Sequence, residues 1–185
     1  TTSDESNTAT NMTVTLSAAA GRDVTVDYAT SNGTATAGSD YTQTNGTLTI
    51  SAGNTQGTIP ITVDLDNIYE GDETVTMTLS NASNATISDA TGTFTITDDE
   101  SAPTVQLAAS ASSIDENSVS TITLTASLSG PTATDANVTV ALGPSGSATE
   151  GTDYSDGSGE VDDIVISAGQ TSGTVTFDPT ADTVC

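Results

Sequence analysis

Residues 74–79 read Thr-Val-Thr-Met-Thr-Leu, a strict alternation of threonine with apolar residues. The same two-residue period recurs at residues 13–16, 47–50 and 93–96. Successive side chains of a β-strand point to opposite faces, so this period gives each segment one apolar face and one threonine face. β-branched threonine suits a half-exposed pleated surface. No segment keeps a helical period, and the chain is therefore predicted to be all-β.

Glycine and asparagine separate the predicted strands, for example at residues 31–33 (Ser-Asn-Gly), 45–46 (Asn-Gly) and 70–72 (Glu-Gly-Asp). These residues favour the tight turns that connect neighbouring strands. Pro60 lies inside the predicted strand at residues 58–63. Because proline has no N–H to donate to a neighbouring strand, Pro60 predicts a sheet edge or a bulge at this point.

The charge of the chain excludes several classes of partner and of enzyme. Arg22 is the one basic residue against 25 Asp and Glu, and the formal net charge is −24. Such a chain cannot neutralise nucleic-acid phosphates, and it has no apolar run long enough for membrane insertion. With no His and a single Cys185, it lacks Ser-His and Cys-His pairs and Cys/His zinc sites. Aromatic residues are too few to line a sugar cleft, so no enzyme is expected.

The sequence contains an internal repeat. The motif Ala-Thr-x-Gly-x-Asp-Tyr occupies residues 35–41 and again 148–154, and Ile-Ser-Ala-Gly-x-Thr-x-Gly-Thr occupies residues 50–58 and again 166–174. Motifs repeated in the same order indicate two homologous domains, at residues 1–100 and 101–185.

Both domains are expected to be incomplete in this window. Residues 103–114 of the second copy, a predicted first strand, have no counterpart in the first copy. The second copy in turn has no counterpart of residues 70–100. The register therefore predicts that the two domains belong to a longer tandem array.

Carboxylates of the first domain concentrate at predicted turns and strand ends, and Asp98, Asp99 and Glu100 are adjacent. Strand ends can converge on one rim of a β-sandwich, where their oxygens could enclose a cation. Since the chain has almost no basic residues, an oxygen-ligated ion such as calcium or magnesium could supply the missing positive charge. A solvated acidic surface is the alternative, and composition leaves both interpretations open.

Four motifs in the first domain resemble the Calx-beta domain family. They occupy residues 33–41, 46–55, 66–75 (Asp-Asn-Ile-Tyr-Glu-Gly-Asp-Glu-Thr-Val) and 94–99 (Phe-Thr-Ile-Thr-Asp-Asp). The resemblance extends into the second domain and implies two tandem immunoglobulin-like antiparallel β-sandwiches. It also implies that calcium binds at the rim near the C-terminal end of each domain.

A set of calcium ligands follows from the same resemblance. In the first domain they are Glu5, Asp40, Asp66, Glu70, Glu73, Asp98 and Asp99, and in the second Glu116, Asp153 and Asp182.

These expectations combine into one functional hypothesis. It is a non-catalytic, calcium-binding structural repeat of a secreted or cell-surface microbial protein of the adhesin or fibre type. Calcium would stiffen the rim and the interdomain joint, and the partners would be neighbouring repeats or other fibre subunits. The alternative hypothesis is a ligand- or ice-binding surface built from the Thr-x-Thr strand faces.

Overall fold

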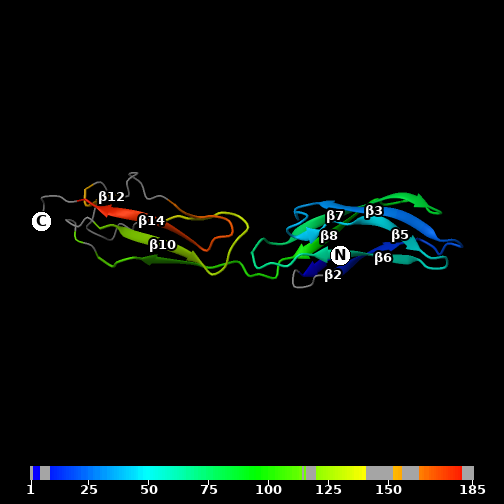
Figure 1. Ribbon diagram of the computed structural model, residues 1–185, viewed down its shortest axis with the longest axis horizontal. Helices are drawn as coiled ribbons and strands as arrows, with labels where there is room; N and C mark the ends of the chain where they lie inside the picture. The colour runs from blue at the N-terminus through cyan, green and yellow to red at the C-terminus, as the bar shows by residue number, and fades with distance from the viewer. Residues whose placement is uncertain are drawn as a thin grey trace. The chain divides into compact units, whose positions relative to one another are not determined.

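The computed structural model describes residues 2–4, 9–113, 115, 120–140, 152–155 and 163–180. Every regular element among them is a β-strand, which confirms the all-β prediction (Figure 1). Among these residues no helix has the length and apolar character needed to cross a membrane. The chain divides into two compact units, Thr1–Asp66 with Glu70–Ser101, and Asn67–Tyr69 with Ala102–Cys185.

Unit 1 is a sandwich of two sheets. The larger sheet has the order β1-β8-β7-β3-β5, and the smaller has the order β2-β6-β4. All neighbouring strands pair antiparallel except β1 and β8, which are parallel. The strands of unit 1 are β1 (Thr2–Asp4), β2 (Ala9–Thr15), β3 (Val24–Asn32), β4 (Tyr41–Thr42), β5 (Asn45–Ile50), β6 (Gln56–Val63), β7 (Glu73–Ser83) and β8 (Thr91–Thr97).

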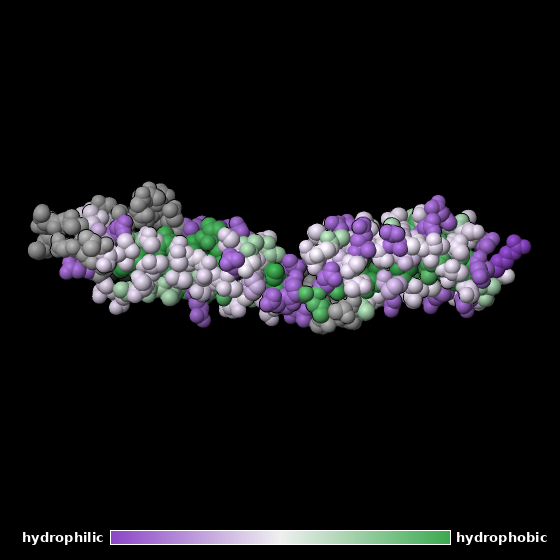
Figure 2. Space-filling view, in the orientation of Figure 1, coloured by the Kyte–Doolittle hydropathy of each residue, from purple (hydrophilic) through white to green (hydrophobic). Residues whose placement is uncertain are grey.

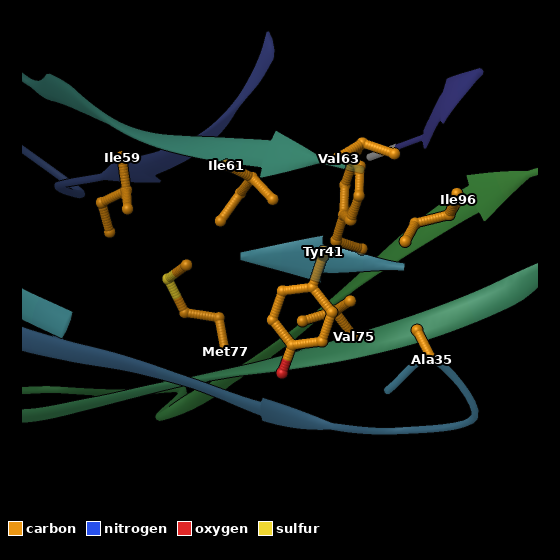
Figure 3. Packing of buried hydrophobic residues seen from close by; sticks show 9 residues of the cluster. Ala35, Tyr41, Ile59, Ile61, Val63, Val75, Met77 and Ile96 are labelled. Carbon is orange, nitrogen blue, oxygen red and sulfur yellow. The ribbon is translucent and has the colours of Figure 1, made fainter. Parts of the chain in front are cut away.

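The core of unit 1 lies between these two sheets. Ile59, Ile61 and Val63 alternate along β6 and point toward Val75 and Met77 on β7 (Figure 3). The residues between them on β6, Pro60 and Thr62, are exposed, and the surface in Figure 2 is mostly white and purple. The two-residue period of the sequence therefore determines which face of each strand is buried.

Pro60 sits in β6, which is the central strand of the smaller sheet and not an edge strand. On one side it lies opposite Asn11 of β2. On the other side β4 spans only Tyr41–Thr42 and pairs with Val63 and Thr62, so it ends before reaching Pro60. The missing N–H is tolerated because this stretch of β6 has a neighbour on one side alone among the described residues.

Unit 2 repeats part of this arrangement. One sheet has the order β12-β14-β10-β9, and a second consists of β11 and β13. Its core cluster includes Ala126, Ile164, Ile166 and Phe177. The strands of unit 2 are β9 (Val105–Ala109), β10 (Ile122–Leu128), β11 (Ala136–Val138), β12 (Tyr154–Ser155), β13 (Ile164–Ile166) and β14 (Ser172–Pro179).

Candidate metal centre

Three carboxylates from two separate parts of the sequence meet at one end of unit 1. Asp40, Glu70 and Glu73 each place a carboxylate oxygen within 4.8 Å of the other two. Asp40 lies in the turn before β4, Glu70 in the connection between β6 and β7, and Glu73 begins β7. Asp40 is only 5% exposed, and the two glutamates are half-buried. The convergence expected from the sequence is therefore present for these three residues.

A tight turn fixes the position of Asp40. Its carboxylate accepts a 2.6 Å hydrogen bond from the Thr36 N–H, and its own N–H donates to the Thr36 carbonyl. Gly38 adopts a φ of 92°, a left-handed conformation that favours glycine. Tyr41, which follows Asp40, is fully buried, and its hydroxyl donates a hydrogen bond to Asn32 Oδ1 at 2.9 Å. The Gly-x-Asp-Tyr motif thus places an acidic residue, Asp40, in a tight turn directly before a tyrosine that packs in the core.

Asp98 holds the loop that carries Glu70. Its Oδ2 accepts hydrogen bonds from the N–H groups of Glu70 and Gly71, and its Oδ1 accepts one from the Glu100 N–H. Burial acts to raise the pKa of Asp98, but these backbone donors outweigh it and hold the pKa below the usual range. Asp98 is therefore an ionised carboxylate that organises the turn around Gly71, whose φ is 80°.

Glu70 lies in the electric field of several other carboxylates of the site. Its pKa is raised, first by burial and then by the negative charges of Asp40, Asp66, Asp98 and Glu100. The pKa of Glu100 is raised in the same way, by burial and then by the charge of Asp99. A nearby positive charge would relieve this repulsion.

The single basic residue cannot supply that charge. Arg22 precedes β3, whereas the acidic residues lie beyond the other end of that strand, where Asn32 pairs with Val75. At about 3.3 Å per residue, the length of β3 separates Arg22 from the acidic end by roughly 30 Å. Coulombic interaction across that distance is screened at physiological salt.

The donor chemistry fits a hard divalent cation. All the side chains concerned are carboxylates, which are the ligands that calcium prefers. The Oε2 atoms of Glu70 and Glu100 are buried and have no hydrogen-bond partner among the described residues. A buried charged oxygen without a partner is costly, and a bound cation would satisfy it. The residues Asp40, Glu70 and Glu73, with Glu100 beside them, can therefore hold such an ion.

The other expected ligands divide into three groups. Asp66 and Asp99 are exposed at the edge of the cluster, close enough for their charges to act on Glu70 and Glu100 respectively. Asp153 precedes β12 in unit 2, where its carbonyl accepts a hydrogen bond from the Thr180 N–H. The remaining three lie outside the described residues: Glu5, Glu116 and Asp182.

Two carboxylates contribute to the site without having been predicted as ligands. Glu100 contributes a buried oxygen, and Asp72 Oδ1 accepts a hydrogen bond from the Asp98 N–H at 3.3 Å. The sequence offered one signal for them: Glu100 follows the predicted ligand Asp99, and Asp72 precedes the predicted ligand Glu73. Only the fold shows that Glu100 turns inward while Asp99 remains exposed.

Comparison with solved structures finds tandem relatives of the same fold. The calcium binding domain CBD12 of CALX1.1 aligns with 95% of this chain and 71% of its own, at 23% identity and a TM-score of 0.52. CBD12 from CALX1.2 aligns with 99% of this chain and 73% of its own, at 22% identity and a TM-score of 0.51. The apo form of the Calx CBD1 domain covers 53% of this chain and 88% of its own, at 28% identity and a TM-score of 0.48.

A comparison with curated proteins finds no match. The Calx-beta domain family model matches this chain twice, over residues 1–100 and over residues 98–185, which together span its whole length. With the β-sandwich architecture, these matches confirm the resemblance seen in the sequence: the chain belongs to the Calx-beta domain family.

Proposed function

We propose that unit 1 binds calcium through Asp40, Glu70 and Glu73, with Asp66, Asp98, Asp99 and Glu100 completing or supporting the site. The observation that carries this proposal is the convergence of three carboxylates within 4.8 Å in a chain whose one cation lies at the far end of β3. Glu5 is a further proposed ligand in this unit. Glu116, Asp153 and Asp182 are the proposed ligands of a second site in unit 2.

The role proposed for the bound ion is structural and non-catalytic. Calcium would neutralise the repulsion that raises the pKa of Glu70, and it would hold the turns around Gly38 and Gly71 together. Stabilisation of a folded protein by a ligand grows with the logarithm of ligand concentration over its dissociation constant, reaching about 2.7 kcal/mol at 100-fold excess. Unit 1 should therefore be more stable with calcium than without it.

Calorimetric calcium titration and thermal unfolding at matched ionic strength test this proposal. Asp40→Asn should weaken calcium binding by roughly tenfold or more, since it removes a buried charged donor. Asp163→Asn is the control, because it removes the same charge from an exposed position in unit 2. Equal melting midpoints in calcium and in chelator would refute the proposal, as would equal effects of the two substitutions.

The setting proposed for this module is a tandem array in a secreted or cell-surface microbial protein. Two repeats, proposed to divide at residues 100 and 101, would serve as rigid spacers in an adhesin or fibre, with neighbouring repeats or other subunits as partners. The high net negative charge and the dominance of threonine and serine support an extracellular setting.

Calcium is also proposed to stiffen the joint between the repeats. Asp98 is tied to the Glu70 turn and to the Glu100 N–H, and Pro103 restricts the backbone a few residues later. An ion held by this segment would leave few freely rotating residues. Small-angle scattering should then give a narrower distribution of sizes in calcium than in chelator, and identical curves with calcium bound would exclude stiffening.

The alternative of a ligand- or ice-binding threonine face has weaker support. On the outer face of β3, Asp27 lies among the threonines and accepts hydrogen bonds from the side chains of Thr47 and Asn81. The register between β3 and β7 also shifts between Thr25 and Asp27. A charge and an irregularity break the flat array that such a surface requires, so we do not propose it.

A further inference from the structure

One side of β6 has no strand beside it over most of its length. The other side pairs with β2 along residues 56–62. On the first side β4 pairs with Thr62 and Val63 alone. From Gln56 to Ile61 this side therefore has no neighbouring strand in the described part of unit 1, and we call it the open side of β6.

Hydrogen-bond alternation identifies the backbone groups on the open side. The Asp64 N–H donates to the Asp40 carbonyl next to β4. Because successive residues of an antiparallel strand point their backbone groups to opposite sides, Thr62, Pro60 and Thr58 point to the side of β4. The open side thus offers the N–H and C=O of Thr58 and the C=O of Pro60, which has no N–H to add.

The strands before and after β6 in the repeat do not cover its open side. The counterpart of β6 in unit 2 is β14, because Gly57 and Gly173 occupy the same position of the repeated motif. Strand β9, which opens unit 2, pairs with β10 and leaves the corresponding side of β14 to β12 alone. The strands that follow β6, β7 and β8, lie in the other sheet of unit 1. The open side is therefore a feature of the repeat itself.

An uncovered strand needs some feature that keeps it from pairing with another chain. Natural proteins use very short strands, charged side chains, bulges, covering segments or proline. Strand β6 has eight residues, none of them charged. Its register with β2 runs without a shift. Among the described residues, Pro60, whose side chain is exposed, is the protective feature that remains.

Unit 2 has Thr176 at the position of Pro60, and there a second strand lies closer. A Cβ on Gly173 would lie 2.5 Å from the carbonyl oxygen of Val165 in β13. The three nearest atoms to a Cβ on Gly57 belong instead to side chains of β5. The backbone of β13 thus lies against β14, whereas side chains separate β5 from β6. Proline occurs in the unit whose strand is less covered.

We propose that Pro60 keeps unit 1 from pairing through β6 with a second copy of the chain. Without the proline, two antiparallel copies of β6 could pair about Thr58, with Gln56 of each copy opposite position 60 of the other. None of these side chains is charged, and threonine pairs across strands are favourable. Proline removes one of the two hydrogen bonds from each Gln56–Pro60 pair and places its ring at the contact.

The test restores the missing donor. Pro60→Thr, which introduces the residue that unit 2 carries, is compared with the wild-type chain by sedimentation velocity. Measurements at about 1 M salt, where the screening length is about 3 Å, reduce the repulsion between two highly negative chains. The variant should form a dimer with a dissociation constant at least tenfold below any found for the wild type.

Pro60→Asp is the matched control. It restores the same N–H but places a charge on the open side, so the chain should stay as monomeric as the wild type. Thermal unfolding confirms that each variant is folded, as expected for a substitution at an exposed position. Pro60→Val is a second variant that should associate, and it keeps the test valid if threonine lowers the melting midpoint.

Amide hydrogen exchange locates the contact. In Pro60→Thr, exchange at Thr58 should slow as the protein concentration rises. Exchange at Gly57 and Ile59, whose N–H groups point to β2, should change little.

Four outcomes would overturn the proposal. One is that folded Pro60→Thr and Pro60→Val remain as monomeric as the wild type. Another is that Pro60→Asp associates as strongly as Pro60→Thr. The third is association of Pro60→Thr without slower exchange at Thr58, because the contact would then lie elsewhere. The last is concentration-dependent slowing at Thr58 in the wild type, because β6 would then pair in spite of its proline.

Discussion

The Gly-x-Asp-Tyr motif occurs once in each unit, with different results. In unit 1 Tyr41 is fully buried and Asp40 lies within 4.8 Å of two glutamates. In unit 2 Tyr154 is half-buried against the edge of Phe177, and no carboxylate cluster containing Asp153 exists among the described residues. The motif alone therefore supplies one candidate ligand. The cluster also requires the Glu70 turn and Asp98, which follows the end of β8 and holds that turn.

The largest expected difference between the units concerns their cores. Phe94 is fully buried between the two sheets of unit 1, whereas Phe177 retains 7% exposure in unit 2. Phe94→Ala should destabilise unit 1 by about 3–5 kcal/mol, and Phe177→Ala should cost unit 2 less. Urea unfolding followed by NMR signals from each unit measures both. Equal losses would show that the two cores are packed equally well.

A repeated glycine gives a smaller contrast. A Cβ on Gly173 would lie 2.5 Å from the Val165 carbonyl oxygen, whereas one on Gly57 would meet only side-chain carbons, Ile50 Cγ1 the nearest at 3.0 Å. Gly173→Ala should therefore cost about 1–3 kcal/mol, because backbone must move. Gly57→Ala should be nearly neutral, since side chains can shift and alanine restricts the unfolded chain.

Thermal unfolding of the two alanine variants measures this contrast. Gly21→Ala is a third variant for reference, since a Cβ there meets nothing within 4 Å. Should Gly57→Ala prove as damaging as Gly173→Ala, the distinction between side-chain and backbone obstruction would be wrong.

The smallest predicted effect is a pH dependence at Asp27, away from the acidic cluster. Hydrogen bonds from Thr47 and Asn81 lower its pKa below the usual 3.8. The stabilisation from this ionised carboxylate is therefore complete above the ordinary pKa and is lost as pH falls through the lowered one. Asp27→Asn should reduce the decline in melting midpoint over this acidic window. Midpoints in chelator from about pH 5 to about pH 2 would test it, and parallel curves would contradict it.

The sequence predicted the strands well because apolar residues at every second position indicate a strand with one buried face. The threonine-alternating runs became β2, β5, β7 and β8, and the turn at residues 70–72 lies between strands. Strand order was not predictable, because it depends on which edges meet in space; the parallel pairing of β1 with β8 left no local pattern.

For the site, the sequence identified carboxylates but not their individual positions. Asp40, Glu70 and Glu73 were expected together and lie together. The role of Asp98 as an acceptor for backbone N–H groups depends on how β8 ends beside the Glu70 turn. The inward orientation of Glu100 depends on the path of the chain after β8. Both are properties of tertiary structure that the residue types alone do not encode.

The central claim is that the acidic end of unit 1 is built for a cation, and Glu70→Gln tests it most directly. Without calcium the substitution should stabilise unit 1, because it removes a partly buried charge that four other carboxylates repel. With saturating calcium it should destabilise unit 1, because it removes a proposed ligand. Thermal unfolding of the wild type and the variant, in chelator and in calcium at matched ionic strength, measures both signs. A reversal of sign is the predicted result, and a substitution effect with the same sign and size in both conditions would contradict the account.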